Sequence, residues 1–303
     1  MKKLVLNPLK SSIVSSSYNL IQNRGLSSIS KIFIMRHAES HFNSEIKKLE
    51  NAKNTMNESD YEKLKADIRF SKEFIDCEIT EKGKNQCLMA GKKLNDFKID
   101  YVFVSPLRRT LMTCEHSIKE IESNKPHVIV YPFIFEKIED SCDIIGDISR
   151  NMRDYPHYDW KFFETVYSKK SYQLDYCDVW PFEFKTSNSN AAEEDSKHKH
   201  NILGDDHEQN LDIVLDAMRQ LCVKEKYIES SFKTVERLKS FKRYINSFMM
   251  EKKNESIEDK NILVIGHSIL FKHLTANYLD EETYEPTENS ILGNCELAEI
   301  SFL

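Results

Sequence analysis

The sequence lacks three features that would place it in other classes of protein. Its 7 cysteines include no pair at CxxC spacing, which indicates neither a disulfide framework nor a zinc site and fits a reducing compartment. It has no uninterrupted apolar run long enough to cross a bilayer. Its formal net charge of -6 leaves no uniformly basic face, which argues against non-specific nucleic-acid binding.

Acidic residues are absent from the first 38 positions, where Lys2, Lys3, Lys10 and Arg24 lie among many serines. This bias resembles a mitochondrial transit peptide, and a disordered cytosolic extension explains it equally well. We therefore interpret residues 1–30 as an N-terminal extension and expect a cytoplasmic or mitochondrial protein. Residues 31–303 are interpreted as one domain, interrupted by a polar, low-complexity stretch at about 185–210 that predicts a mobile surface loop.

Short apolar runs alternate with helix-like segments along the domain. The runs predict strands, and the strands are expected at 32–35, 100–105, 127–131, 261–266 and 295–302. Helices are expected within a solvated insertion at 44–75, at 81–94 after the N-cap Thr80, from Pro106 onward with Ser105 as N-cap, and near 211–222 and 231–250. The alternation predicts an α/β fold with three layers, in which helices cover both faces of a mostly parallel central sheet.

Basic side chains follow three of the predicted strands. Arg36 and His37 follow the first, Arg108 and Arg109 follow the second after a short turn, and His267 follows the fourth. Ligands of such sheets bind beyond the carboxyl ends of the strands, so these residues are expected to converge at one edge. Guanidinium groups match phosphate oxygens, and a neutral imidazole is nucleophilic near neutral pH. The edge therefore predicts a phosphate clamp, formed by Arg36 and Arg109, around a histidine.

Four sequence blocks occur in a recognisable order. They are RHAESHFN at 36–43, EITEKGKNQ at 78–86, SPLRRTLMT at 105–113 and IGHS at 265–268. Together they resemble the signature of the histidine phosphatase superfamily, whose fold is phosphoglycerate mutase-like, and the resemblance extends over about residues 31–301.

The resemblance implies a role for each matching residue. His37 would be the nucleophile that forms a phosphohistidine, Arg36, Arg109 and His267 would bind the phosphoryl group, and Asn43 would add a hydrogen bond. The proton donor would come from the segment PFIFEKIEDSCDIIG at 132–146. Glu136 is the candidate there, with Glu139 and Asp140 behind it, and a solvated acidic loop is the structural alternative.

The sequence departs from the family pattern in ways that affect the expected reaction. Ala38 and Met112 replace a common glycine and glutamine without removing a charge, and the acid segment lacks the Glu-Arg-His-Tyr-Gly-like stretch of the mutases. Hydrolysis is therefore favoured over mutase activity. The pair Cys142-Asp143 resembles a phosphatase-type branch.

The sequence thus predicts a metal-independent phosphatase that hydrolyses phosphomonoesters through a phosphohistidine, without a cofactor. The substrate would be a phosphorylated small molecule or a phosphoprotein. A phosphoglycerate mutase-type phosphotransferase and a catalytically silent phosphate-binding module remain alternatives. The histidines at 198–200 and His207 lie in the polar stretch and are not interpreted as metal ligands. Trp160 and Trp180 are expected in core packing rather than at a substrate entrance.

Overall fold

The computed structural model describes residues 3–5, 30–122, 125–162, 229–255, 260–287 and 291–300. A five-stranded sheet lies at its centre, in the order β4-β3-β5-β2-β7. The strands are β2 (Ile32–Arg36), β3 (Ile99–Val104), β4 (His127–Val130), β5 (Asn261–Gly266) and β7 (Leu297–Ile300). Only β7 runs antiparallel to its neighbour, so the prediction of a mostly parallel sheet is confirmed.

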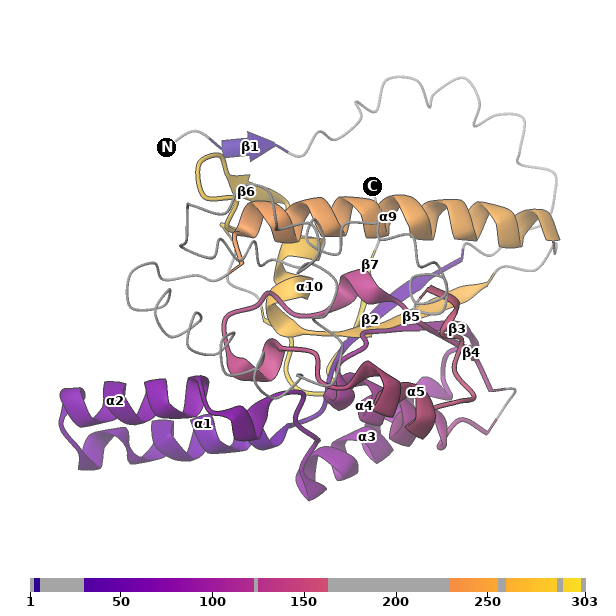
Figure 1. Ribbon diagram of the computed structural model, residues 1–303. Helices are drawn as coiled ribbons and strands as arrows, with labels where there is room; N and C mark the ends of the chain where they lie inside the picture. Colours follow the sequence, from indigo (N-terminus) through magenta and orange to yellow (C-terminus); the bar gives the residue numbers. More distant parts are fainter. Residues whose placement is uncertain are drawn as a thin grey trace, which may run out of the picture.

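Helices cover both faces of this sheet (Figure 1). On one side lie α3 (Glu81–Leu94), α4 (Arg108–Ile118) and α5 (Ile148–Asp154), and on the other lie α9 (Ser231–Glu255) and α10 (Ser268–Thr275). Alternate residues of β2 serve the two cores, because successive side chains of a strand point to opposite faces. Phe33 and Met35 pack with α3 and α4, whereas Ile32 and Ile34 pack with α9 and α10. The predicted three-layer α/β architecture is confirmed.

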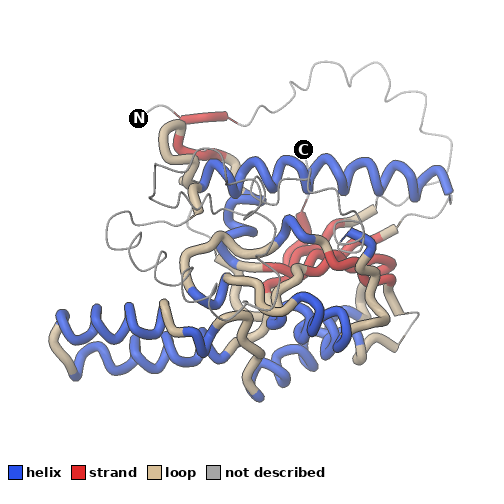
Figure 2. The backbone as a smooth tube through the Cα atoms, in the orientation of Figure 1, coloured by secondary structure: helices blue, strands red, loops and turns tan. Residues whose placement is uncertain are grey.

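The insertion expected at 44–75 is a helical hairpin that projects from the domain (Figure 2). It consists of α1 (His41–Ala52), η2 (Lys53–Thr55), α2 (Glu58–Arg69) and η3 (Lys72–Phe74). Most of its residues are exposed, while Phe42 and Phe74 pack edge to face at its base. The base therefore anchors the hairpin beside the strand end that carries His37.

Other elements were not expected from the sequence. A second sheet pairs β1 (Lys3–Val5) with β6 (Tyr278–Asp280), and short turns η4 (Pro132–Ile134) and η5 (Ser141–Asp143) interrupt the acidic segment. Trp160 is buried in the core as predicted. Trp180, the histidines at 198–200, His207, the stretch 185–210 and the helix near 211–222 lie outside the described residues. Among the described helices, none is both long and apolar enough to span a membrane.

The predicted start of the helix after β3 is wrong. Helix α4 begins at Arg108, with Leu107 as its N-cap residue and no side-chain cap from Ser105. The Ser105 hydroxyl is instead 2.8 Å from His267 Nε2. The carboxylate of Asp76 caps the helix instead, because its Oδ1 accepts a hydrogen bond from Arg108 N at 2.7 Å. A residue distant in sequence thus satisfies the helix terminus and frees Ser105 for the site.

Candidate active site

The site lies where three neighbouring parallel strands end. Strands β2, β5 and β3 are adjacent in the sheet, and His37, His267 and Ser105 each follow one of them directly. Backbone bonds continue the strand pairing through these positions, since His37 N donates to Gly266 O at 2.9 Å and Ser105 N donates to Ile265 O at 3.1 Å. The two imidazole centroids are 5.3 Å apart. The expected convergence of the two histidines is confirmed.

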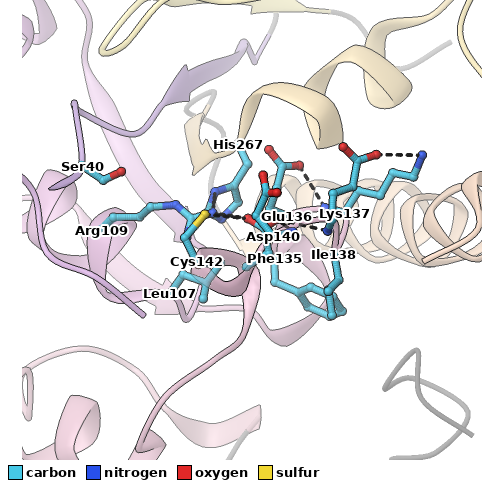
Figure 3. Close-up of polar contacts among 12 residues, drawn as sticks. Ser40, Leu107, Arg109, Phe135, Glu136, Lys137, Ile138, Asp140, Cys142 and His267 are labelled. Carbon is cyan, nitrogen blue, oxygen red and sulfur yellow. Dashed lines mark hydrogen bonds and ion pairs between the residues drawn. The ribbon is translucent and has the colours of Figure 1, made fainter. Parts of the chain in front are cut away.

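Arg109 connects the groups that meet at this edge. Its Nε donates to His37 Nε2 at 3.3 Å, and one terminal nitrogen lies 3.1 Å from His267 Nδ1. The same terminal nitrogen is 2.9 Å from the Asp143 carboxylate, while the other donates to the Cys142 carbonyl. Figure 3 shows the guanidinium reaching toward His267 and Cys142, with Glu136 and Asp140 beyond them. One buried cation therefore touches both predicted catalytic histidines.

These contacts fix the protonation state of both rings. His37 Nδ1 lies 2.7 Å from the Ala38 carbonyl, which can only accept, so Nδ1 carries the proton and Nε2 presents a lone pair to Arg109. In His267 the pattern is reversed, because Nδ1 accepts from Arg109 and Nε2 donates to Ser105. Burial, together with the charges of Arg109 and Arg36, lowers the pKa of His37 well below its usual value. Burial and Arg109 act on His267 in the same direction.

A titration followed by NMR checks these assignments. Because the pKa of each ring is lowered, we expect His37 and His267 to remain neutral at pH 5.5, where a free imidazole would be about nine-tenths protonated. The ¹⁵N shifts should give the Nδ1–H tautomer for His37 and the Nε2–H tautomer for His267. Spectra of the His37→Gln and His267→Gln proteins assign the signals. A titration midpoint at or above 6.5 for His37, or an Nε2–H tautomer, would contradict the geometry.

Arg36 has one donor in use and one buried without a partner. Its terminal nitrogen donates to the Leu292 carbonyl at 3.0 Å, whereas Nε is covered and has no hydrogen-bond partner among the described residues. Burial of this guanidinium lowers its pKa. Leaving a buried N–H unsatisfied is costly, and such a group is a fit for an incoming anion.

Glu136 lies next to the predicted clamp but is already engaged. Its carboxylate accepts hydrogen bonds from Ile269 N at 3.1 Å and Leu270 N at 2.8 Å, in the first turn of α10 directly after His267. Burial raises the pKa of Glu136, and the charge of Arg109 opposes that shift. The carboxyl is thus buried and held in place beside His267. Glu136 therefore does not belong to a solvated acidic loop, which was the structural alternative for this segment.

The other acids of the segment are held by different cations. Asp140 is 2.5 Å from Arg69 Nε, and Glu139 is 3.2 Å from Lys137 Nζ. Burial raises the pKa of Asp140 to about 6. Asp140, Cys142 and Asp143 lie close enough together to be considered a metal cluster, but Arg69 and Arg109 already pair with its two carboxylates.

The structure places Asn43 and Arg108 less centrally than the sequence suggested. Asn43 and Ser40 form a reciprocal cap at the start of α1, in which Asn43 Oδ1 accepts from Ser40 N at 3.4 Å and Asn43 N donates to the Ser40 hydroxyl. The role of Asn43 as a phosphate ligand stays a prediction. Arg108 points away to Glu78 and Asp154, at 2.8 and 2.7 Å, and holds the surrounding loops.

Sequence reasoning missed three groups that contact the site. Asp143 pairs with Arg109, Ser105 bonds to His267, and Asn294 donates to the His37 carbonyl at 2.9 Å. The Cys142-Asp143 pair was noticed as a resemblance, but nothing in the sequence indicates that the carboxylate pairs with Arg109. Asn294 lies 257 residues from His37 in the chain and gives no local signal.

Residues 32–129 match the sequence model of the histidine phosphatase superfamily (branch 1). This match agrees with the resemblance that the motifs carry. The matched segment includes Arg36, His37 and Arg109, while Glu136 and His267 lie beyond it. A search of curated proteins gives no match.

Several solved structures are similar to the chain. An ecdysone phosphate phosphatase from Bombix mori in complex with tungstate is 13% identical with a TM-score of 0.44, covering 90% of this chain and 89% of its own. A phosphoglycerate mutase from Bacillus anthracis is 16% identical with a TM-score of 0.42 and coverages of 91% and 93%. A mycobacterial glucosyl-3-phosphoglycerate phosphatase is 14% identical with a TM-score of 0.44 and coverages of 90% and 91%.

Proposed function

We propose that this protein is a phosphomonoesterase that works through a phosphohistidine on His37 Nε2. One observation supports the proposal most directly. The Nε2 lone pair of His37 is unprotonated and in contact with Arg109, while Nδ1 is fixed by the Ala38 carbonyl. An unprotonated imidazole nitrogen can attack a phosphoryl group, and the cationic donors around it can stabilise the charge on the equatorial oxygens.

The first step transfers the phosphoryl group to His37. The unpartnered Arg36 Nε–H is a donor for one equatorial oxygen. Arg109, which now donates to Asp143, and His267 Nε2–H, which now donates to Ser105, are donors for the others once the phosphate replaces these acceptors. His37 is 3% exposed and Arg109 2%, so covering side chains must move aside before a phosphoryl group reaches Nε2. Burial also strengthens each charge interaction in the site, because the surrounding dielectric is low.

The second step transfers the phosphoryl group from His37 to water. Glu136 is the proposed proton donor for the leaving oxygen, and the resulting carboxylate then activates the water. Its raised pKa favours the protonated form required in the first step. The arginines and His267 supply the charge stabilisation, so the proposed reaction needs no metal or cofactor. The proposed substrates are phosphorylated small molecules or phosphoproteins.

The proposal is tested by phosphate release in excess EDTA. An aryl phosphate and a panel of phosphorylated metabolites and peptides are offered to the purified protein. EDTA-resistant release supports the proposal, and the best substrate of the panel gives the substrate class. If the panel is inert but 3-phosphoglycerate isomerises when primed with the bisphosphate, the protein is a mutase. If phosphate binds and nothing turns over, the site is a binding module.

The role of Glu136 is tested by the leaving group. Glu136→Gln should slow hydrolysis of alkyl phosphates by about 10²-fold or more and that of a nitrophenyl phosphate far less, because a good leaving group needs no proton. Glutamine keeps the size of the side chain and one acceptor for α10, and urea unfolding of the variant shows whether that contact is retained. Equal losses on both substrates would point to another acid, and Asp140→Asn is the matched comparison.

A further inference from the structure

Two cysteines that take no part in the proposed reaction pack together near the end of strand β2. Cys87 is on α3 and fully buried, and Cys295 is half-buried in the turn before β7. Cys295 packs against the small cluster that contains Cys87, Ala38 and Ile79. The two positions are 208 apart in sequence numbering, so only the fold brings these sulfurs together.

One of the two cysteines lies partly at the surface. Cys295 lines a hollow at the surface together with Lys82, Gln86 and Asn294. The pair therefore combines a half-buried cysteine beside a surface hollow with a covered cysteine that is shielded from other thiols. Cys295 lowers the pKa of Cys87, whereas Cys87 and burial raise the pKa of Cys295, so a thiolate in the pair is favoured on Cys87.

The turn that carries Cys295 holds the backbone of the site. Cys295 N donates to the Arg36 carbonyl at 3.0 Å, and Arg36 N donates to the Glu296 carbonyl at 3.4 Å. The Asn294 side chain donates to the His37 carbonyl at 2.9 Å. Any displacement of this turn is thus transmitted to Arg36 and His37 through three hydrogen bonds.

We propose that Cys87 and Cys295 form a reversible disulfide under peroxide, and that this bond slows the reaction at His37. In the first step one sulfur attacks a peroxide oxygen, which gives a sulfenic acid and releases water when the oxidant is hydrogen peroxide. In the second step the other sulfur attacks the sulfenic sulfur, the S–S bond forms and a second water leaves. The protein loses two electrons and two protons, and a small dithiol restores both. In a reducing compartment such bonds are transient and redox-sensing.

The bond changes the site because it is shorter than the contact it replaces. Two sulfurs in non-bonded contact must approach to about 2.05 Å, which draws the turn of Cys295 toward α3. Helix α3 cannot move the other way easily, because it packs tightly on the loop that follows His37. A Cβ added at Gly83 would collide with the Glu39 carbonyl of that loop. The displacement therefore falls on the turn and on the Arg36 and His37 backbone.

Peptide mapping tests the bond independently of any activity. The full-length protein is treated with hydrogen peroxide, remaining thiols are alkylated, and the digest is searched by mass spectrometry for a peptide that links Cys87 to Cys295. We expect this link in the wild type and its loss after dithiothreitol. Mapping also separates it from links through Cys177 or Cys222. Absence of the link at peroxide doses that oxidise other cysteines would overturn the proposal.

The effect on the site rests on the proposed phosphatase activity and is measured separately. We expect peroxide to lower aryl phosphate hydrolysis several-fold in the wild type and in Cys114→Ala, a control at a buried cysteine in another part of the core. Cys87→Ser and Cys295→Ser should be resistant, and dithiothreitol should restore the wild type. Inhibition that persists in Cys295→Ser, or a complete link without inhibition, would overturn the regulatory role. If no protein shows activity, phosphate binding by the reduced and the linked forms replaces the rate.

Discussion

The His37→Ala variant is expected to lose turnover almost completely. Removing a nucleophile that forms a covalent intermediate typically costs roughly 10³-fold or more in rate, because no other group can take over the bond. In this site we expect a loss of rate toward the upper end of that range. His37 Nε2 is an unprotonated imidazole nitrogen that contacts Arg109. The unprotonated nitrogen of His267, Nδ1, contacts the same guanidinium but comes from a different strand.

Labelling of the phosphoenzyme separates the nucleophile from a merely structural histidine. The wild type, mixed with a ³²P-labelled phosphomonoester and quenched in base to preserve the labile bond, should carry label on the peptide that contains His37. His37→Ala should carry none. His267→Gln should still label, more slowly, because that variant removes a proposed phosphoryl ligand and keeps the proposed attacking nitrogen of His37.

The matched control is a histidine outside the site. His127 is 55% exposed at its side chain and pairs with Asp159 at the start of β4, so His127→Gln should retain full turnover and labelling. If His37→Ala keeps most of the wild-type rate while folding normally, the phosphohistidine route is wrong. Label on His267 in that variant would indicate that the two rings exchange roles.

The sequence allowed the fold and the centre of the site to be predicted because their signals are local. Each of β2, β3 and β5 is a short, continuous apolar run, as strands buried on both faces require, and the functional residues follow these runs directly. A parallel arrangement then places Arg36, His37 and His267 together without knowledge of any contact.

The sequence could not reveal the partners that hold these residues, because they come from distant segments. Ser105 was expected to cap its own helix, a local and frequent interaction, but Asp76 satisfies that helix and Ser105 binds His267. Asp143 likewise lies 34 residues from Arg109, in a segment whose many acids look alike in sequence. Pairing of this kind depends on burial, and burial is a property of the fold.

The Arg109→Met variant is expected to lose both activity and stability. The side-chain exposures of Arg109 and Asp143 are 3% and 5%, so removing the guanidinium leaves a buried carboxylate without its cation. Breaking a buried ion pair from one side typically costs about 3–5 kcal/mol. The proposed phosphoryl ligand and the contact to His37 Nε2 are lost in the same step, so turnover should fall by roughly 10³-fold or more.

The stability loss should depend on pH in a defined direction. Burial raises the pKa of Asp143 to about 6 even with Arg109 present, and loss of the cation raises it further. A carboxyl whose pKa is higher in the folded than in the unfolded state favours folding when protonated, and this contribution is lost as pH rises through the folded pKa. Urea unfolding should therefore show a larger difference between wild type and Arg109→Met at pH 8 than at pH 5.5.

A second substitution separates the two functions of Arg109. In Arg109→Met/Asp143→Asn the unpaired charge is gone, and an amide oxygen still accepts from the backbone of Glu139 and Asp140, which now bond to the carboxylate at 3.2 and 3.0 Å. We expect this protein to regain about 2 kcal/mol of the lost stability at pH 8, because contacting residues are strongly coupled. It should remain inactive, since the guanidinium that contacts both His37 and His267 is gone. Recovery of activity together with stability would mean that Arg109 serves only to neutralise Asp143, and strictly additive destabilisation would mean that the two residues are not paired in solution.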